Sequence, residues 1–310
     1  MSGASRVLDI HIGSFNIGIH QSMLTCSGAQ EYIDQTEHII ATCAKVGQLH
    51  IMNLCELGGH RQGFAAANIN EADMGIFRGT AAASVSVDSN YLTAWGFDTD
   101  TPQFGVRATR PSKTFWLTSK VCEPELIVHA FKKGVGFRLI LGNLHIRIPQ
   151  KKKVKTTHKQ KIVAEALRQL ENEAVQLENE ALVDSATQPI VLVLVGDCNL
   201  VKETAMQATQ PLQPEVDDFL SVWHVHRTEA GKSGDLMFVK GAHADIFELP
   251  FGVSHDDRGA RNDNHDAIGI QLRVRTETKP EPAPKRNRMH SGQSERFGAR
   301  TDYGFPACKW

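Results

Sequence analysis

Short apolar segments alternate with polar turns along most of the chain, from residue 7 to residue 274. These segments are rich in Val, Ile, Leu and Phe, and they have the usual length of β-strands. We predict strands at residues 7–15, 49–54, 115–118, 125–131, 137–146, 190–195, 236–239 and 267–274. Residues 132–136, Lys-Lys-Gly-Val-Gly, separate two of these strands and predict a hairpin connection.

One long segment, residues 155–183, has the periodicity of a helix. Its apolar residues recur every three or four positions and therefore share one face of a helix. They are Val163, Leu167, Leu170, Ala174, Leu177 and Ala181. The sequence Leu-Glu-Asn-Glu-Ala occurs at 170–174 and again at 177–181, so a coiled-coil partner is an alternative. Because a coiled coil needs about three or four heptads, we favour an amphipathic helix packed on a sheet.

The character of the chain changes near its C-terminal end. Residues 276–310 are rich in proline, charge and small polar side chains, and such a segment buries too little apolar area to offset the entropy of ordering. We therefore predict one folded domain at residues 1–275 and a disordered tail at 276–310. The basic run at 285–288 suits either a nuclear address or ordinary solvated tail charge.

Overall composition is that of an ordinary globular protein, with 310 residues, a formal net charge of −1 and 41% hydrophobic residues. No run of about 18 apolar residues predicts a membrane span, and the N-terminus lacks the apolar core of a secretory signal. We expect an intracellular protein, cytoplasmic or nuclear. The six cysteines are scattered, which argues against a zinc site or a disulfide scaffold.

Polar side chains follow several predicted strands at the point where each strand ends. Residues two apart on a strand project to the same side, so Asn143 points with His145, and Asp197 points with Asn199. The first two strands end in Gly-Ser-Phe-Asn16 and Met-Asn-Leu-Cys-Glu56. In layered α/β proteins the loops at strand ends shape the functional cleft.

The residue types at these strand ends indicate what chemistry they support. Carboxylate and amide oxygens are ligands for Mg²⁺, Mn²⁺ or Ca²⁺, and histidines exchange protons near neutral pH. Together they suit metal-assisted attack of water on a phosphate ester. Each residue alone has a structural alternative: Asn16 as a turn cap, Asp197 and Asn199 as a loop start, or His145 as a sheet-edge histidine.

The order of these motifs resembles that of the endonuclease/exonuclease/phosphatase superfamily, which includes deoxyribonuclease I. The matching segments are Ser-Phe-Asn16, Glu56, Asn-Leu-His145, Gly-Asp-Cys-Asn199, Gly-Asp-Leu-Met-Phe238 and Asn-His265. The resemblance implies an α/β (α+β) fold, a four-layered sandwich of two packed, mostly antiparallel sheets flanked by helices. It also implies an active cleft at one edge of the sandwich and a metal-dependent phosphodiesterase, most simply a nuclease.

The resemblance also implies a role for each matched residue. Asn16, Glu56, Asp197 and Asn264 would hold Mg²⁺, with Mn²⁺ as an alternative. Asn143 and His145 would bind the scissile phosphate, and Asp197 with Asn199 would align the nucleophile and the leaving oxygen. Asp235 would orient His265, and His265 would be the general base that activates water.

The last motif departs from the family pattern. The family has Ser-Asp-His-x-Pro, whereas this chain has Asp-Asn-His-Asp-Ala at 263–267. Asn264 therefore replaces an acid, which would weaken metal binding or mark a chain without catalysis. Ser-His-Asp at 254–256 offers a rival histidine, His255, but we favour His265 because a predicted strand follows it directly.

A basic run begins immediately after His145, and its first members are Arg147, Lys151, Lys152 and Lys153. We predict that these side chains grip a phosphate backbone, although a solvated helix entry is an alternative. Nucleic acid is then the expected substrate, with no membrane and no obligate protein partner. A phosphatase or phospholipase-type hydrolase of a small phosphoester, and a catalytically impaired binding module, remain alternatives. His224-Val-His226 we interpret as a surface or edge strand.

Overall fold

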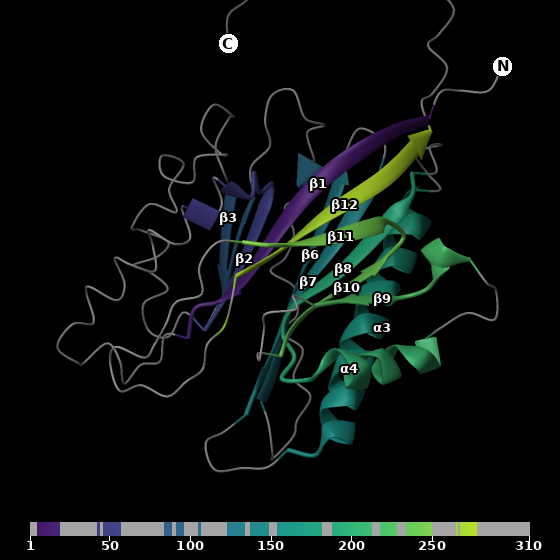
Figure 1. Ribbon diagram of the computed structural model, residues 1–310. Coiled ribbons are helices and arrows are strands. Elements are labelled where there is room, and N and C mark those ends of the chain that lie inside the picture. The colour runs from purple at the N-terminus through teal and green to yellow at the C-terminus, as the bar shows by residue number, and fades with distance from the viewer. Residues whose placement is uncertain are drawn as a thin grey trace, which may run out of the picture. The chain divides into compact units, whose positions relative to one another are not determined.

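The strands assemble into two six-stranded sheets, which Figure 1 shows packed against each other. The computed structural model describes residues 5–18, 42–43, 46–56, 84–88, 91–95, 105–106, 123–133, 137–148, 154–181, 188–212, 218–227, 234–249, 265 and 267–277. The first sheet has the order β11 (His243–Glu248), β12 (Ile268–Glu277), β1 (Ser5–Asn16), β2 (Ile51–Cys55), β4 (Tyr91–Trp95) and β3 (Ser84–Asp88). The second has the order β5 (Gly105–Val106), β6 (Glu123–Lys133), β7 (Arg138–Arg147), β8 (Ile190–Asp197), β10 (Asp235–Lys240) and β9 (His224–His226).

Both sheets are mostly antiparallel, with one parallel pair in the middle of each. β1 runs parallel to β2, and β7 runs parallel to β8. A parallel pair requires a crossover connection, which helix α3 (Thr156–Ala181) provides between β7 and β8. The predicted hairpin is confirmed to the extent that β6 and β7 pair antiparallel on either side of it.

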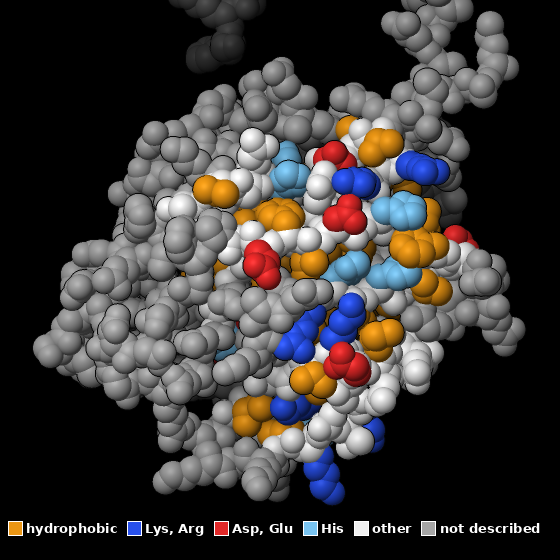
Figure 2. Space-filling view, in the orientation of Figure 1, with side chains coloured by type: hydrophobic (Ala, Val, Ile, Leu, Met, Phe, Trp, Pro, Cys, Tyr) orange, Lys and Arg blue, Asp and Glu red, His pale blue; other side chains and the backbone are white. Residues whose placement is uncertain are grey.

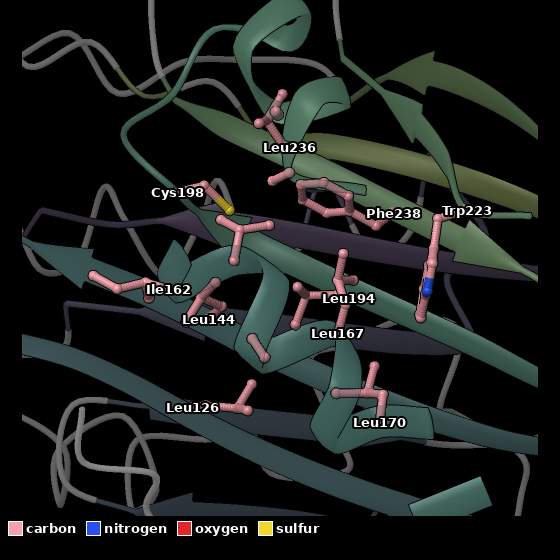
Figure 3. Close-up of a cluster of buried hydrophobic side chains, with 14 of the residues drawn as sticks. Leu126, Leu144, Ile162, Leu167, Leu170, Leu194, Cys198, Trp223, Leu236 and Phe238 are labelled. Carbon is pink, nitrogen blue, oxygen red and sulfur yellow. The ribbon is translucent and has the colours of Figure 1, made fainter. Parts of the chain in front are cut away.

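Helix α3 covers the outer face of the second sheet, together with α4 (Lys202–Thr209) and the single turn η2 (Gln210–Leu212). The described part of the predicted apolar stripe, from Val163 to Leu177, packs on this sheet, as Figure 3 shows for Leu167 and Leu170 against Leu126, Leu144 and Leu194. The sheet thus takes up the face that a coiled-coil partner would need. Arg138 is buried near the end of α3 and donates a hydrogen bond to the carbonyl of Leu177 at 2.8 Å.

A second apolar cluster fills the space between the two sheets. Alternate residues of the strands contribute to it, for example Ile10 and Ile12 from β1 and Val193 and Val195 from β8. The neighbours Leu192 and Leu194 point to the opposite side, toward α3. This alternation follows from the strand period of two and determines which side chains of β7, β8 and β10 face the first sheet.

Most predicted strands are present within about two residues of their expected ends, and β3, β4, β5 and β11 are additional. The turn η3 (Phe219–Ser221) and the strand β9 bring the Phe219 ring onto His224, with ring centroids 3.9 Å apart. The predicted strand at 115–118 and residues 278–310 of the predicted tail lie outside the described residues, whereas residues 276 and 277, also predicted as tail, pair with β1 as the end of β12. Among the described residues, no helix is both long and apolar enough to cross a membrane.

Candidate active site

The apolar layer between the sheets becomes polar at one end, and this change occurs on several strands at once. On β8 the inward residues Val191, Val193 and Val195 are followed by Asp197. On β7 the inward residues Leu139 and Leu141 are followed by Asn143 and His145. Asn143, His145 and Asp197 are each at most 3% exposed. Buried polar groups are costly unless they are paired, so their partners determine what this cluster can do.

Three contacts join the polar ends of the two sheets. Asn16 at the end of β1 donates from Nδ2 to Asp197 Oδ2 at 3.2 Å. His145 Nε2 lies 3.1 Å from Oε1 of Glu56, the residue after β2. Asn143 donates from Nδ2 to the carbonyl of Leu54 at 3.4 Å. The strand ends of both sheets therefore form one continuous cluster.

His265 lies between two buried carboxylates. Its Nδ1 is 2.8 Å from Asp235 Oδ2, and its Nε2 is 3.9 Å from Asp197 Oδ2. Asn16 Nδ2 approaches the same Nε2 at 3.4 Å. When Nδ1–H donates to Asp235, Nε2 faces Asp197 and Asn16. At that position Nε2 can exchange a proton with a water molecule or a phosphate oxygen.

The cluster carries an excess of negative charge. Burial lowers the pKa of His265, but the hydrogen bond and charge of Asp235, with the charges of Asp197 and Glu56, raise it to about 9. Burial raises the pKa of Asp197, as does the charge of Asp235, while the two histidines His265 and His145 lower it. Glu56, Asp197 and Asp235 thus act on the same buried histidine, an arrangement that favours a bound cation.

Two site residues have left-handed backbone conformations. Glu56 has φ of 59° and Asn199 has φ of 50°. Asparagine tolerates this region, but for glutamate it costs on the order of 1 kcal/mol. Asn199 is held by a bond from its backbone N–H to Asp197 Oδ1 at 2.8 Å and by one from Nδ2 to the carbonyl of Ile146 at 3.0 Å.

The backbones of Gly234 and Gly196 lie so close to neighbouring backbone atoms that neither position leaves room for a side chain. A Cβ added at Gly234 would lie 2.4 Å from the Cα and N atoms of Asn199, and one added at Gly196 would lie 2.1 Å from the Leu144 carbonyl oxygen. Lys159 of α3 donates from Nζ to the carbonyl of Asn199 at 2.6 Å. Sequence reasoning placed Lys159 only in a basic run, since nothing local in the sequence indicates this contact.

The donor set fits a hard divalent cation. Ligand atoms of Asp197, Asp235 and His265 lie within 4.8 Å of one another, and the Glu56 carboxylate and the Asn16 amide adjoin them. Asn143 Oδ1 is a buried acceptor that finds no hydrogen-bond donor among the described residues. Oxygen-rich sites of this kind suit Mg²⁺ or Mn²⁺.

The structure brings together eight of the predicted residues, namely Asn16, Glu56, Asn143, His145, Asp197, Asn199, Asp235 and His265. The remaining predictions fall on Lys151, Lys152, Lys153 and Asn264, which lie outside the described residues, as does the rival His255. Arg147 ends β7, but its side chain is likewise outside the described part. For the pair His224 and His226, no metal-ligand set is found among the described residues.

The cysteines near the cluster are thiols without a disulfide partner. Cys55 and Cys198 are both buried and free, and burial together with the neighbouring carboxylates raises the pKa of both thiols. A thiol with a raised pKa is a poor nucleophile and a poor metal ligand.

No family model and no curated protein matches the chain. Among solved structures, ANGEL2, a 2′,3′-cyclic phosphatase, is similar with a TM-score of 0.51 and 10% identity, over 88% of this chain and 98% of that one. An endonuclease/exonuclease/phosphatase family protein from Bacteroides thetaiotaomicron has a TM-score of 0.49 and 13% identity, over 87% and 99% of the two chains. Truncated TDP2 from Caenorhabditis elegans has a TM-score of 0.47 and 11% identity, over 85% of this chain and 97% of that one. The fold class predicted from the motifs is confirmed: the chain has two packed, mostly antiparallel sheets with helices on the outside, and it shares this fold with ANGEL2.

Proposed function

We propose that this protein is a metal-dependent phosphodiesterase that hydrolyses nucleic acid, with residues 1–275 as its catalytic domain. The observation that carries the proposal is the placement of His265 between Asp235 and Asp197, at 2.8 Å and 3.9 Å. One carboxylate can fix the imidazole tautomer while the other faces the nitrogen that exchanges a proton. This is the arrangement that activation of a water molecule requires.

In the proposed mechanism, His265 Nε2 accepts a proton from the attacking water; a bound cation would offset the carboxylates that raise the pKa of this histidine to about 9, and so would leave it neutral. Asp235 holds Nδ1–H and stabilises the imidazolium that forms. Asp197 and Asn199 align the water and the leaving oxygen, because both end at the same strand terminus. Asn143 and His145 contact the phosphate from the neighbouring strand β7.

Glu56, Asn16 and Asp197 would hold the metal, and Asn264 would add an amide oxygen. When bound, Mg²⁺ supplies positive charge that polarises the phosphate ester and offsets the charge of the transition state. The carboxylates of the cluster remain close together without repulsion once a cation is present. The pairing of His145 with Glu56 then also positions the imidazole beside the phosphate.

A second candidate, hydrolysis of a small phosphoester, is favoured by one specific observation. ANGEL2 has this fold and is described as a 2′,3′-cyclic phosphatase, so a protein of this fold can act as a phosphatase. The choice between these candidates depends on the surface around the site, because function is determined by the site and not by the fold.

Metal removal tests the proposed function. We expect plasmid DNA or single-stranded RNA to be cleaved with Mg²⁺ or Mn²⁺ and to remain intact in EDTA, with products followed by gel electrophoresis. Asp197→Asn should lower the rate by on the order of 10³-fold, because the aligning carboxylate is lost. Asp245→Asn, at an exposed carboxylate of β11, is the matched control and should leave the rate unchanged. If neither polymer is cut with any metal, the nuclease proposal is wrong.

Gly234→Ala tests whether the Asn199 loop must stay in place. The added Cβ would collide with the Asn199 backbone, so we expect on the order of 10²-fold lower kcat from misplacement of the aligning groups. Overpacking should also cost about 1–3 kcal/mol of stability. Gly269→Ala collides with the Phe247 ring in the first sheet and should lower Tm without lowering kcat at a permissive temperature. Equal kcat values for the two variants would contradict the prediction.

A further inference from the structure

Helix α3 carries its charges in the order opposite to that which stabilises a helix. Its start contains His158, Lys159 and Lys161 and no acid in the first turn, and its last turn contains no base. Lys155 precedes it directly, and Glu178 stands near its end. A helix dipole favours anions at the N-terminus and cations at the C-terminus. The lysines at the start of α3 therefore do not serve helix stability and call for another explanation.

The start of α3 adjoins the candidate active site. Lys159 contacts the Asn199 carbonyl at 2.6 Å, and the exposed Lys155 directly precedes the helix, where its carbonyl accepts a hydrogen bond from the backbone N–H of Lys159 at 3.3 Å. Lys202 opens α4 only three residues after Asn199. Figure 2 shows several Lys and Arg side chains over α4 and the adjoining part of α3, with an acidic side chain between them. We call Lys155, Lys159 and Lys202 the basic surface.

The two helices that carry the basic surface are fixed side by side. Gln160 Nε2 donates to the Thr204 carbonyl at 3.0 Å and to Gln207 Oε1 at 2.9 Å. α4 begins after Val201, and its first turn contains the acid Glu203 beside Lys202.

The basic surface supplies positive charge, which the carboxylate-rich cluster lacks. The buried cluster contains Glu56, Asp197 and Asp235, which repel a phosphate chain, whereas beyond Asn199 three lysines outnumber the exposed Glu203. A polyanion can approach the carboxylates only if neighbouring cations hold the rest of the chain. A small phosphoester would end inside the cluster and would gain nothing from lysines one or two turns away.

We propose that the basic surface binds the sugar-phosphate backbone of a nucleic-acid strand that continues past the scissile phosphate on the Asn199 side. This inference rests on the proposed function and deepens it, because it assigns the substrate as a polynucleotide and not a small phosphoester. Lys155 and Lys202 contact backbone phosphates, and Lys159 positions the Asn199 loop. Recognition by these lysines depends on the backbone and not on base sequence.

Direct binding in EDTA tests the inference without cleavage. The probe is a fluorescein-labelled single strand of about 20 nucleotides, a length chosen to reach beyond one or two phosphate contacts, prepared as DNA and as RNA. The variant is Lys155→Gln with Lys202→Gln, and Lys159 is left intact because it holds the Asn199 carbonyl. The control is Lys161→Gln with Arg168→Gln, which removes two charges from exposed positions of the same helix.

We expect the Lys155/Lys202 variant to bind on the order of tenfold more weakly and to reduce the slope of log Kd against log salt by about 1.4, two phosphates at about 0.7 each. The control should keep the wild-type slope, and turnover of bis(4-nitrophenyl) phosphate should be unchanged in both. Equal losses in the two variants, or a matching loss on the small diester, would overturn the inference. Strand binding with the predicted slopes but no cleavage by the wild type would support the inference and overturn the proposed function alone.

Discussion

His265→Ala is expected to lower kcat for phosphodiester cleavage by on the order of 10³-fold, the middle of the range for loss of a general base. The imidazole is the one group in the described cluster that faces both a tautomer-fixing carboxylate and a second carboxylate. KM should change little, because the phosphate contacts from Asn143 and His145 on β7 stay in place. Steady-state kinetics on a labelled oligonucleotide with saturating Mg²⁺ provides the measurement.

Asp235 could act by orienting His265 or by holding the metal, and a double-mutant cycle distinguishes these two roles. If Asp235 acts only through His265, then Asp235→Asn added to His265→Ala should cause no further loss, because residues that act as a unit are not additive. His243→Ala, at an exposed histidine of β11, is the control and should keep wild-type kcat. Additive losses would instead assign Asp235 to the metal, with which its carboxylate distance is also compatible.

His255 is the alternative candidate for the general base. His255 stands in Ser-His-Asp, a motif as close to the family pattern as that around His265. If His255→Ala abolished cleavage while His265→Ala did not, the general base would be His255 and the proposed mechanism would be wrong. The contact of His265 with Asp235 makes the opposite result the expected one.

The position of the site could be predicted because the alternation of side chains along a strand can be recognised from neighbouring residues in the sequence. Asn143 with His145, and Asp197 with Asn199, each follow an apolar strand at a spacing of two. The same alternation determines that their strands bury Leu141 and Val195 just before the polar residues begin. The fold then brings these strand ends to one edge, so that the predicted residues form a single cluster.

The contacts inside the cluster could not be predicted from the sequence. Asn16 and Asp197 are 181 positions apart, and their hydrogen bond depends on how the two sheets are placed against each other. Glu56 and His145 were assigned separate partners, a metal and a phosphate, yet they pair with each other at 3.1 Å across the sheets. No local pattern specifies the relative position of two sheets, since that follows from packing of the whole apolar layer.

The strand β11 and the helix α4 were not predicted, because their sequences show little hydrophobic periodicity. β11 is an edge strand whose side chains are largely exposed or half-buried, so its sequence lacks the apolar alternation that marks an interior strand. α4 has eight residues and buries only Ala205, Ala208 and Thr209, too few for a periodic signal. α4 nevertheless matters for function here, because its first residue, Lys202, completes the basic surface.

Glu56→Gln should remove most of the response of the protein to metal while preserving its fold. The carboxylate of Glu56 is only 16% exposed, and its backbone is held at φ of 59°. A conformation that costs energy and persists at a strand end indicates that the direction of this side chain matters. Glutamine keeps the size of the side chain and an oxygen that can accept a hydrogen bond from His145, so only the negative charge is lost.

The thermal shift produced by Mg²⁺ separates a metal ligand from a merely structural residue. At about 100 times its Kd, a bound ion adds about 2.7 kcal/mol to the free energy of unfolding, which raises Tm by about 5 °C for a domain of this size. We expect the wild type and Glu248→Gln, at an exposed glutamate of β11, to show this shift and Glu56→Gln to lose it. In EDTA, Glu56→Gln should melt at or above the wild-type temperature, because removing one of the crowded carboxylates relieves repulsion with Asp197 and Asp235. A full Mg²⁺ shift in Glu56→Gln would show that the cation is held by the Asp197, Asp235 and His265 group instead.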